Sequence, residues 1–139
     1  MLTNTLQQEL LQELRRILDY WATETVDETN GGFIGRISHH NIKDPYAVKG
    51  SVLNARILWT FSAAYNLLGT AQYRELATRA WDYLRSCFAD KVHGGLYWTV
   101  DYTGKVVDNK NRFMPSHLGY MPAVNISKQA AMKQRRKWL

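Results

Sequence analysis

Arg56 has the sequence surroundings that most clearly suggest chemistry. It lies in the run from Val52 to Tyr65, which is apolar or small at nearly every position. A helix that is apolar on every side is normally buried among other helices, and a buried guanidinium must be paired or face a polar cavity. Two hypotheses follow. Arg56 forms a structural ion pair, with Asp44 or Asp101 as its partner, or it presents a fixed set of donors to a ligand.

The histidines and the single cysteine do not add a catalytic pattern. His39 and His40 lie in a polar segment and are expected to be solvated, and His93 precedes a turn glycine. His117 lies in the basic C-terminal part, and Cys87 lies in a helical pattern, where a buried small hydrophobic residue is expected rather than a nucleophile. HExxH, CxxC, P-loop and GxGxxG patterns do not occur. The sequence therefore contains none of these metal-binding or nucleotide-binding patterns.

The segments on either side of Arg56 repeat along the chain. "NGGFIGRI" (30–37) and "HGGLYWTV" (93–100) each begin a short alternating run with two glycines. At an offset of 63, the similarity widens to "LDYWATETVDETNGGF" against "WDYLRSCFADKVHGGL", with five identities in sixteen positions, among them Asp27 and Asp90. Such internal repetition indicates one supersecondary unit used twice.

Hydrophobic periodicity predicts three helices. Residues 5–25 carry an apolar stripe with spacings of three or four residues, formed by Leu6, Leu10, Leu14, Ile17 and Trp21. Residues 50–68 form a second helix that Gly69 ends, and Thr70 is expected to cap a third helix that reaches about Phe88.

Short β segments separate these helices. Gly31 and Gly32 can take the positive φ angles that lead into the first one. "GGLYWTVDYTGKVVD" alternates well enough for a hairpin with Thr103 and Gly104 in its turn. The repeated unit is therefore a helix, a glycine-led β loop, a helix, a short turn and the next helix.

Composition sets broad limits on function. The 139 residues amount to one domain, no apolar run approaches the roughly 20 residues of a membrane span, and no secretion signal is seen. A single cysteine fits a reducing cytoplasm. Residues 1–108 have a net charge of 11 − 12 = −1, whereas residues 109–139 hold seven Lys and Arg and no acid. A basic excess confined to one end is weak evidence for nucleic-acid binding, which usually involves a basic face of a folded domain.

The string "KGSVLNARILWTFSAAYNLLG", with "DETNGGFIGRI" before it and "ATRAWDYLRSCFADKVHGGLYWTVDYTGKVVD" after it, resembles bacterial cellobiose 2-epimerases of the N-acylglucosamine 2-epimerase superfamily. The likeness runs from about Leu11 to Asn111 and implies residues 1–111 to be the N-terminal part of an all-α (α/α)6 barrel with short β hairpins or loops at its rim. By this resemblance Arg56 binds the sugar and stabilises its enediolate, and Tyr97 and Trp98 are possible rim contacts.

The same resemblance implies an isomerase that converts cellobiose to 4-O-β-D-glucosyl-D-mannose without a cofactor or a metal. Its partner is then a β-1,4-linked disaccharide, with neither nucleic acid nor membrane involved. Histidines tuned near neutral pH suit the removal and return of the C2 proton. In the family these histidines lie on segments that this chain lacks, so the chain itself is expected to be an inactive, poorly stable part of the enzyme.

Residues 112–139 depart from the family pattern. Pro115 and Pro122 fall where the family has an inner helix, which prolines would break. The protein sequence from Phe113 onward can be back-translated into a set of codons. When that nucleotide sequence is read in a shifted frame, starting at the third base of the first codon, it encodes an apolar helical pattern that ends in glycine. A frameshift near residues 110–113 is therefore expected, which leaves an aberrant, basic and disordered tail; a natural short protein is the alternative.

Two other functions stay open at this point. One is a related sugar 2-epimerase that acts on an N-acylglucosamine or on mannobiose. The other is a small helical binding module whose basic end contacts RNA or an acidic partner, which a steep loss of affinity with salt would support.

Overall fold

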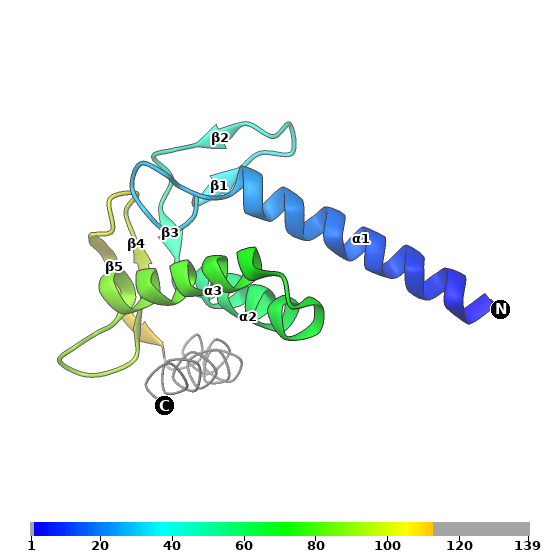
Figure 1. Ribbon diagram of the computed structural model, residues 1–139. Coiled ribbons are helices and arrows are strands. Elements are labelled where there is room, and N and C mark those ends of the chain that lie inside the picture. Colours follow the sequence, from blue (N-terminus) through cyan, green and yellow to red (C-terminus); the bar gives the residue numbers. More distant parts are fainter. Residues whose placement is uncertain (1, 113–139) are drawn as a thin grey trace, which may run out of the picture.

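Helices dominate the part of the chain that the computed structural model describes, residues 2–112 (Figure 1). They are α1 (Leu2–Glu24), α2 (Ser51–Leu68) and α3 (Ala71–Tyr83), and α3 ends in a π-helical turn, η1 (Leu84–Phe88). The strands are β1 (Arg36–Ile37), β2 (Lys43–Asp44), β3 (Lys49–Gly50), β4 (Leu96–Val100) and β5 (Val106–Arg112). The three predicted helices are confirmed, with α1 starting three residues before the predicted position.

Helix α1 projects from the other described elements, and its C-terminal part packs on the core (Figure 1). The predicted stripe is wrong at Leu6, Leu10 and Ile17, which are 56%, 61% and 42% exposed. The residues that contact the core are Leu14, Leu18, Trp21 and Ala22. Leu18 is only 1% exposed although it lies outside the predicted stripe. The buried face is therefore rotated relative to the one that spacing alone selected.

Helices α2 and α3 form a hairpin around the core. Ile57, Leu58 and Phe61 of α2 are at most 4% exposed, and Tyr73 and Ala80 of α3 pack in the same cluster. The other side of α2 is not covered by the described residues. Helix α2 is therefore apolar on nearly all sides in sequence, but only one of its sides is buried.

The connection between α2 and α3 follows the predicted turn chemistry in part. Gly69 takes the left-handed conformation, with φ 71°, and its N–H donates to the Tyr65 carbonyl at 2.8 Å, as expected for a helix-ending glycine. Thr70 occupies the N-cap position of α3, but its side chain makes no capping hydrogen bond, so the predicted cap is wrong. Its backbone carbonyl instead accepts a hydrogen bond from Tyr73 N at 3.1 Å.

Two small antiparallel sheets connect the helices. β1 pairs with β2, and the second sheet has the order β3-β4-β5. Gly50 of β3 pairs with Thr99 of β4, so the start of α2 is attached to the second sheet. The predicted hairpin is confirmed, with Gly104 at φ 97° in its turn. Register shifts occur around Thr99, and the alternation of β4 is broken: Trp98 is 37% exposed, whereas Leu96 and Val100, two positions before and after it, are buried.

The repeat predicted from the glycine pairs is confirmed in the backbone. In the first unit Asp27 N donates to Gly32 O and Gly31 N to Asp27 O, each at 3.1 Å. The second unit has the same two bonds, 63 residues later: Asp90 N to Gly95 O at 3.1 Å and Gly94 N to Asp90 O at 3.0 Å. The isolated bridges Val26–Phe33 and Ala89–Leu96 are spaced by the same offset.

The repeat extends beyond the segment that shows sequence identity, into the turns of both hairpins. The side-chain oxygen of Ser38 accepts hydrogen bonds from the N–H groups of residues 40 and 42, as Asp101 does from those of residues 103 and 105. Asn41, with φ 60°, stands where the second turn has Gly104. Different residue types therefore support the same turn.

The described chain is thus mostly helical, with two small sheets. None of its helices is long and apolar enough to cross a membrane. The predicted aberrant tail, 112–139, lies outside the described residues except for Arg112, which is the last residue of β5.

Candidate functional site

Arg56 is exposed, which corrects the expectation of a buried guanidinium. Neither proposed ion-pair partner meets it. Asp44 accepts a hydrogen bond from Arg36 at 2.6 Å, and Asp101 Oδ1 accepts bonds from Thr103 and Lys105 in its own turn. Within residues 2–112 no hydrogen bond or ion pair of Arg56 is seen, so the hypothesis of a structural ion pair is wrong there.

Trp59 lies on the same face of α2 as Arg56, three positions later, and is 50% exposed. Trp59 belongs to the run from Val52 to Tyr65, whose apolar sequence predicts a helix buried among other helices. The signal that identifies it is its spacing from Arg56, which places both side chains on one helix face. A guanidinium beside an exposed indole offers hydrogen-bond donors and a flat apolar surface together.

Strand β4 lies next to the start of α2 and carries the two predicted rim residues. The hydroxyl of Ser51, the first residue of α2, donates to the Trp98 carbonyl at 3.1 Å. Tyr97 is half-buried. Its partial burial and the neighbouring Asp90 carboxylate raise the pKa of the Tyr97 phenol above its ordinary value. The Tyr97 hydroxyl thus lies beside the Asp90 carboxylate at the base of the second glycine loop.

The described histidines lie on loops. His39 and His40 are exposed in the turn between β1 and β2, with ring centres 3.8 Å apart, as predicted for a polar loop. His93 Nδ1 lies 3.2 Å from Asp90 Oδ2 in the second glycine loop, and its side chain is 79% exposed. His117 lies outside the described residues. Between residues 2 and 112, no three His, Cys, Asp or Glu side chains are grouped so as to hold a metal ion.

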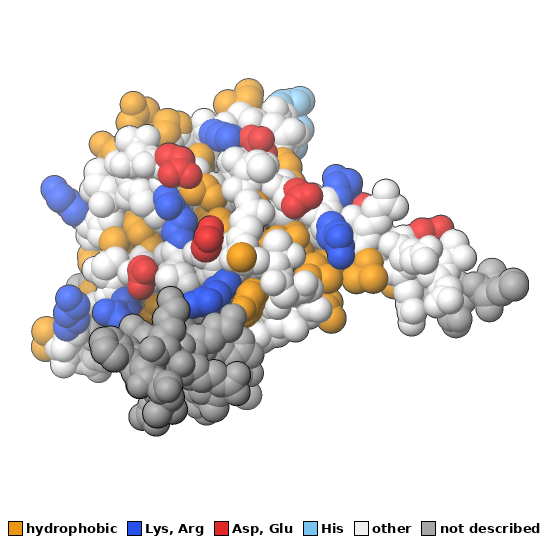
Figure 2. All heavy atoms as spheres, in the orientation of Figure 1, with side chains coloured by type: hydrophobic (Ala, Val, Ile, Leu, Met, Phe, Trp, Pro, Cys, Tyr) orange, Lys and Arg blue, Asp and Glu red, His pale blue; other side chains and the backbone are white. Residues whose placement is uncertain are grey.

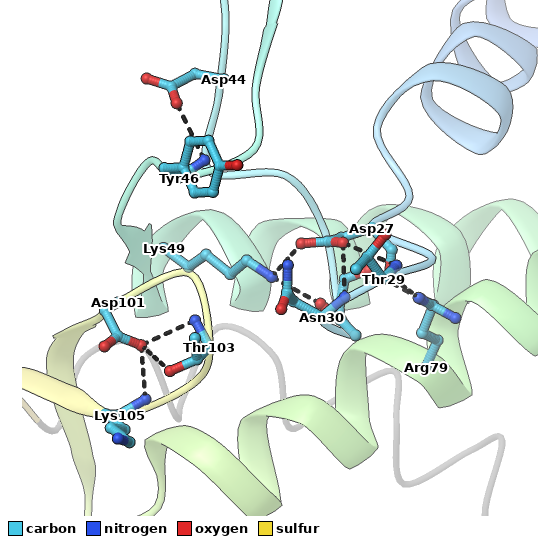
Figure 3. A network of polar contacts seen from close by, with 12 residues as sticks. Asp27, Thr29, Asn30, Asp44, Tyr46, Lys49, Arg79, Asp101, Thr103 and Lys105 are labelled. Carbon is cyan, nitrogen blue, oxygen red and sulfur yellow. Dashed lines mark hydrogen bonds and ion pairs between the residues drawn. The ribbon is translucent and has the colours of Figure 1, made fainter.

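A buried polar network fixes the segment that leads into α2 (Figure 3). Lys49 is 1% exposed, and its Nζ donates to Asp27 Oδ2 and to the Gly31 carbonyl, each at 2.7 Å. The same Nζ lies 5.0 Å from the centre of the Tyr83 ring. Arg79 of α3 donates hydrogen bonds to the backbone carbonyls of Asp27 and Gly32. Two cations therefore hold the first glycine loop against β3 and α3.

The charge state of Asp27 follows from this network. Burial alone would raise the pKa of this carboxyl, but the hydrogen bonds from Lys49 and from the Asn30 N–H outweigh burial and hold the pKa below its ordinary value. Lys49 and Asp27 thus form a buried, charge-assisted pair that directly precedes the helix carrying Arg56. This pair anchors the site; neither partner is exposed to a ligand.

Charges on the visible face of the molecule are mixed. Figure 2 shows Lys and Arg side chains interspersed with Asp and Glu over the described residues on this face. A basic patch of the kind that binds nucleic acid is not seen among the described residues in this view.

Comparison with known proteins identifies the family. The sequence profile of N-acylglucosamine 2-epimerase (GlcNAc 2-epimerase) matches residues 31–117. The chain belongs to this family. It is 51% identical over 108 residues to the cellobiose 2-epimerase of Bacteroides fragilis, an alignment that covers 77% of this chain and 28% of that relative. The chain therefore spans little more than a quarter of the length of this N-acylglucosamine 2-epimerase family member.

Solved structures of the family agree with the sequence match. A sugar epimerase from a ruminal bacterium superposes with a TM-score of 0.77 at 28% identity, covering 90% of this chain and 33% of that one. The cellobiose 2-epimerase of Bacillus thermoamylovorans superposes with a TM-score of 0.72 at 29% identity, covering 88% and 36%. The resemblance to cellobiose 2-epimerases that the sequence indicated is confirmed.

Proposed function

We propose that this chain is the N-terminal part of an (α/α)6-barrel carbohydrate 2-epimerase and that it holds part of the disaccharide-binding site. The observation that carries the proposal is Arg56: an exposed arginine without an intramolecular partner among the described residues, on a helix whose start is fixed by the Lys49–Asp27 pair. The 51% identity to a cellobiose 2-epimerase favours cellobiose over an N-acylglucosamine as the sugar.

The proposed reaction starts from the open-chain form of the reducing-end glucose. A base removes the proton from C2, next to the C1 carbonyl, and the electron pair forms an enediolate. Return of a proton to the opposite face of C2 gives the mannose epimer, so that cellobiose becomes 4-O-β-D-glucosyl-D-mannose. The guanidinium of Arg56 donates hydrogen bonds to the enediolate oxygens, whose negative charge develops in the transition state.

Proton transfer at C2 needs a base whose pKa lies near neutral and which is fixed beside the sugar. We propose that residues 2–112, the described part of the chain, supply no such base, since their histidines, His39, His40 and His93, are exposed loop residues away from the Arg56 helix in sequence. The chain then binds sugar through Arg56 and Trp98 and does not turn it over.

Deuterium exchange separates binding from chemistry. The purified chain is incubated with cellobiose in D2O, and deuterium at C2 is followed by NMR together with the backbone amide shifts of the protein. The proposal predicts shifts concentrated in α2 and β4 and exchange no faster than without protein. Exchange above the protein-free rate would overturn the claim of inactivity, and the absence of any shift in α2 and β4 would overturn the binding site.

A further inference from the structure

Tyr46 and Tyr102 form an edge-to-face pair where the loop after β2 meets the turn after β4. Their ring centres are 5.2 Å apart and the ring planes are at 88°. Tyr46 is 73% exposed although it is a large aromatic side chain. Edge-to-face packing is a favourable arrangement of two aromatic rings, and it helps to keep the exposed Tyr46 ring in one orientation.

The backbone on both sides of the pair is fixed. Asp44 Oδ1 accepts a hydrogen bond from Tyr46 N at 3.1 Å, and Pro45 restricts the residue between them. On the other side, Asp101 Oδ1 accepts hydrogen bonds from Thr103 N at 2.8 Å and from Lys105 N at 3.0 Å, which closes the turn that holds Tyr102. The two rings are therefore presented by ordered turns.

The surroundings of Tyr46 suit a sugar ring. A flat aromatic face can pack against the C–H side of a pyranose, while planar charged groups nearby can bond its hydroxyls. Arg36 and Asp44 supply such groups, paired at 2.6 Å and both reachable by solvent. A tyrosine has only two side-chain torsions, so its ordering on binding costs little.

We propose that the Tyr46–Tyr102 pair binds the second, non-reducing sugar ring of the disaccharide. This inference rests on the proposed function, in which Arg56 and Trp98 hold the reducing-end ring. Trp98 and Tyr102 are four positions apart in the sequence, which is at most about 13 Å along an extended chain. This distance allows separate contacts to two linked rings, so the pair selects a disaccharide over a monosaccharide.

The test compares the affinities of the 139-residue chain for cellobiose and for glucose, measured by NMR titration. Tyr46→Ala is expected to weaken cellobiose binding about three- to tenfold, in line with the loss of one aromatic contact, and to leave glucose binding unchanged. Tyr46→Phe keeps the ring and is expected to keep the affinity for cellobiose. Val92→Ala is the control at an exposed apolar side chain outside the pair, because Val92 is 82% exposed on the second glycine loop.

Each outcome decides the proposal. Equal loss of affinity for both sugars in Tyr46→Ala, unchanged cellobiose affinity, or failure of the wild-type chain to prefer cellobiose would overturn it. Loss of affinity in Tyr46→Phe would also overturn the stacking role. The proposed function fails differently: it predicts that Arg56→Ala weakens binding of glucose and cellobiose alike, whatever the outcome at Tyr46. Because Tyr46 is largely exposed, its variants are expected to retain the wild-type amide spectrum elsewhere.

Discussion

Asp27 and Asp90 lie 63 positions apart and perform the same structural task. Each carboxylate accepts hydrogen bonds from the N–H groups two and three residues ahead, at 3.1 and 2.9 Å for Asp27 and at 2.9 and 3.0 Å for Asp90. Their second oxygens differ: that of Asp27 meets the buried Lys49, whereas that of Asp90 has the exposed His93 beside it. The repeated unit is therefore the same in its backbone and specialised in its side chains.

Removal of the Lys49 charge is expected to be strongly destabilising. Lys49→Met leaves the Asp27 carboxylate buried without its cation, which should lower the free energy of unfolding by about 3–5 kcal/mol. Adding Asp27→Asn removes the stranded charge but keeps an oxygen for the turn, so the double variant should recover part of the loss. Urea denaturation of the wild type, the two single variants and the double variant measures both effects, and a double variant no more stable than Lys49→Met would contradict the account.

The pH dependence of stability should report on Asp27. Because its pKa is lowered on folding, the carboxylate stabilises the fold above the pKa of an unfolded aspartate, about 3.9, and this contribution disappears as the pH falls through the folded pKa. The stability difference between wild type and Asp27→Asn should thus be constant near neutral pH and shrink below about pH 4. Denaturation midpoints at a series of pH values test this. A difference that grows on acidification is the opposite result.

Glycine substitutions should separate backbone strain from steric overlap. Gly32 has φ 64°, and a Cβ there would lie 2.7–2.9 Å from atoms of the Tyr83 ring, whereas Gly94 has φ 77° and open space. Gly94→Ala should cost about 1–2 kcal/mol through its left-handed backbone. Gly32→Ala should cost about 1–3 kcal/mol more through overpacking.

Gly50→Ala is the matched control for this series. Gly50 has φ −101° and no atom within 4 Å of an added Cβ, so the substitution should change stability by less than about 1 kcal/mol. Thermal unfolding of the three variants gives the order. Equal losses at Gly32 and Gly94 would show that contact with Tyr83 does not limit the first loop.

The helices and the repeat were predictable because their signals are local. Helix periodicity, Gly69 as a helix end and the paired glycines each depend on a few neighbouring residues, and all are found in the structure. The extension of the repeat into the hairpin turns was not predictable from identity. Ser38 and Asp101 differ in type but supply the same acceptor oxygen, and Asn41 takes the backbone conformation that Gly104 takes.

The misplaced predictions concern which faces are covered. The exposure of Leu6 and Leu10 on α1, and of Arg56 on α2, depends on which elements pack beside each helix. The sequence shows that a helix face is apolar, but it does not show which other element, if any, packs against that face. The Lys49–Asp27 pair was missed for a related reason, because the partners are 22 residues apart and only the fold brings them together.

The affinity of the chain for cellobiose with and without the Arg56 guanidinium tests the central claim most directly. Arg56→Ala removes charge-assisted donors and should weaken binding at least about tenfold, Arg56→Lys should recover only part of the affinity, and Arg85→Ala, at another exposed arginine, should have no effect. NMR titration of the four proteins under one set of conditions measures this. Wild-type affinity in Arg56→Ala, or an equal loss in Arg85→Ala, would contradict the assignment of Arg56 to the sugar site.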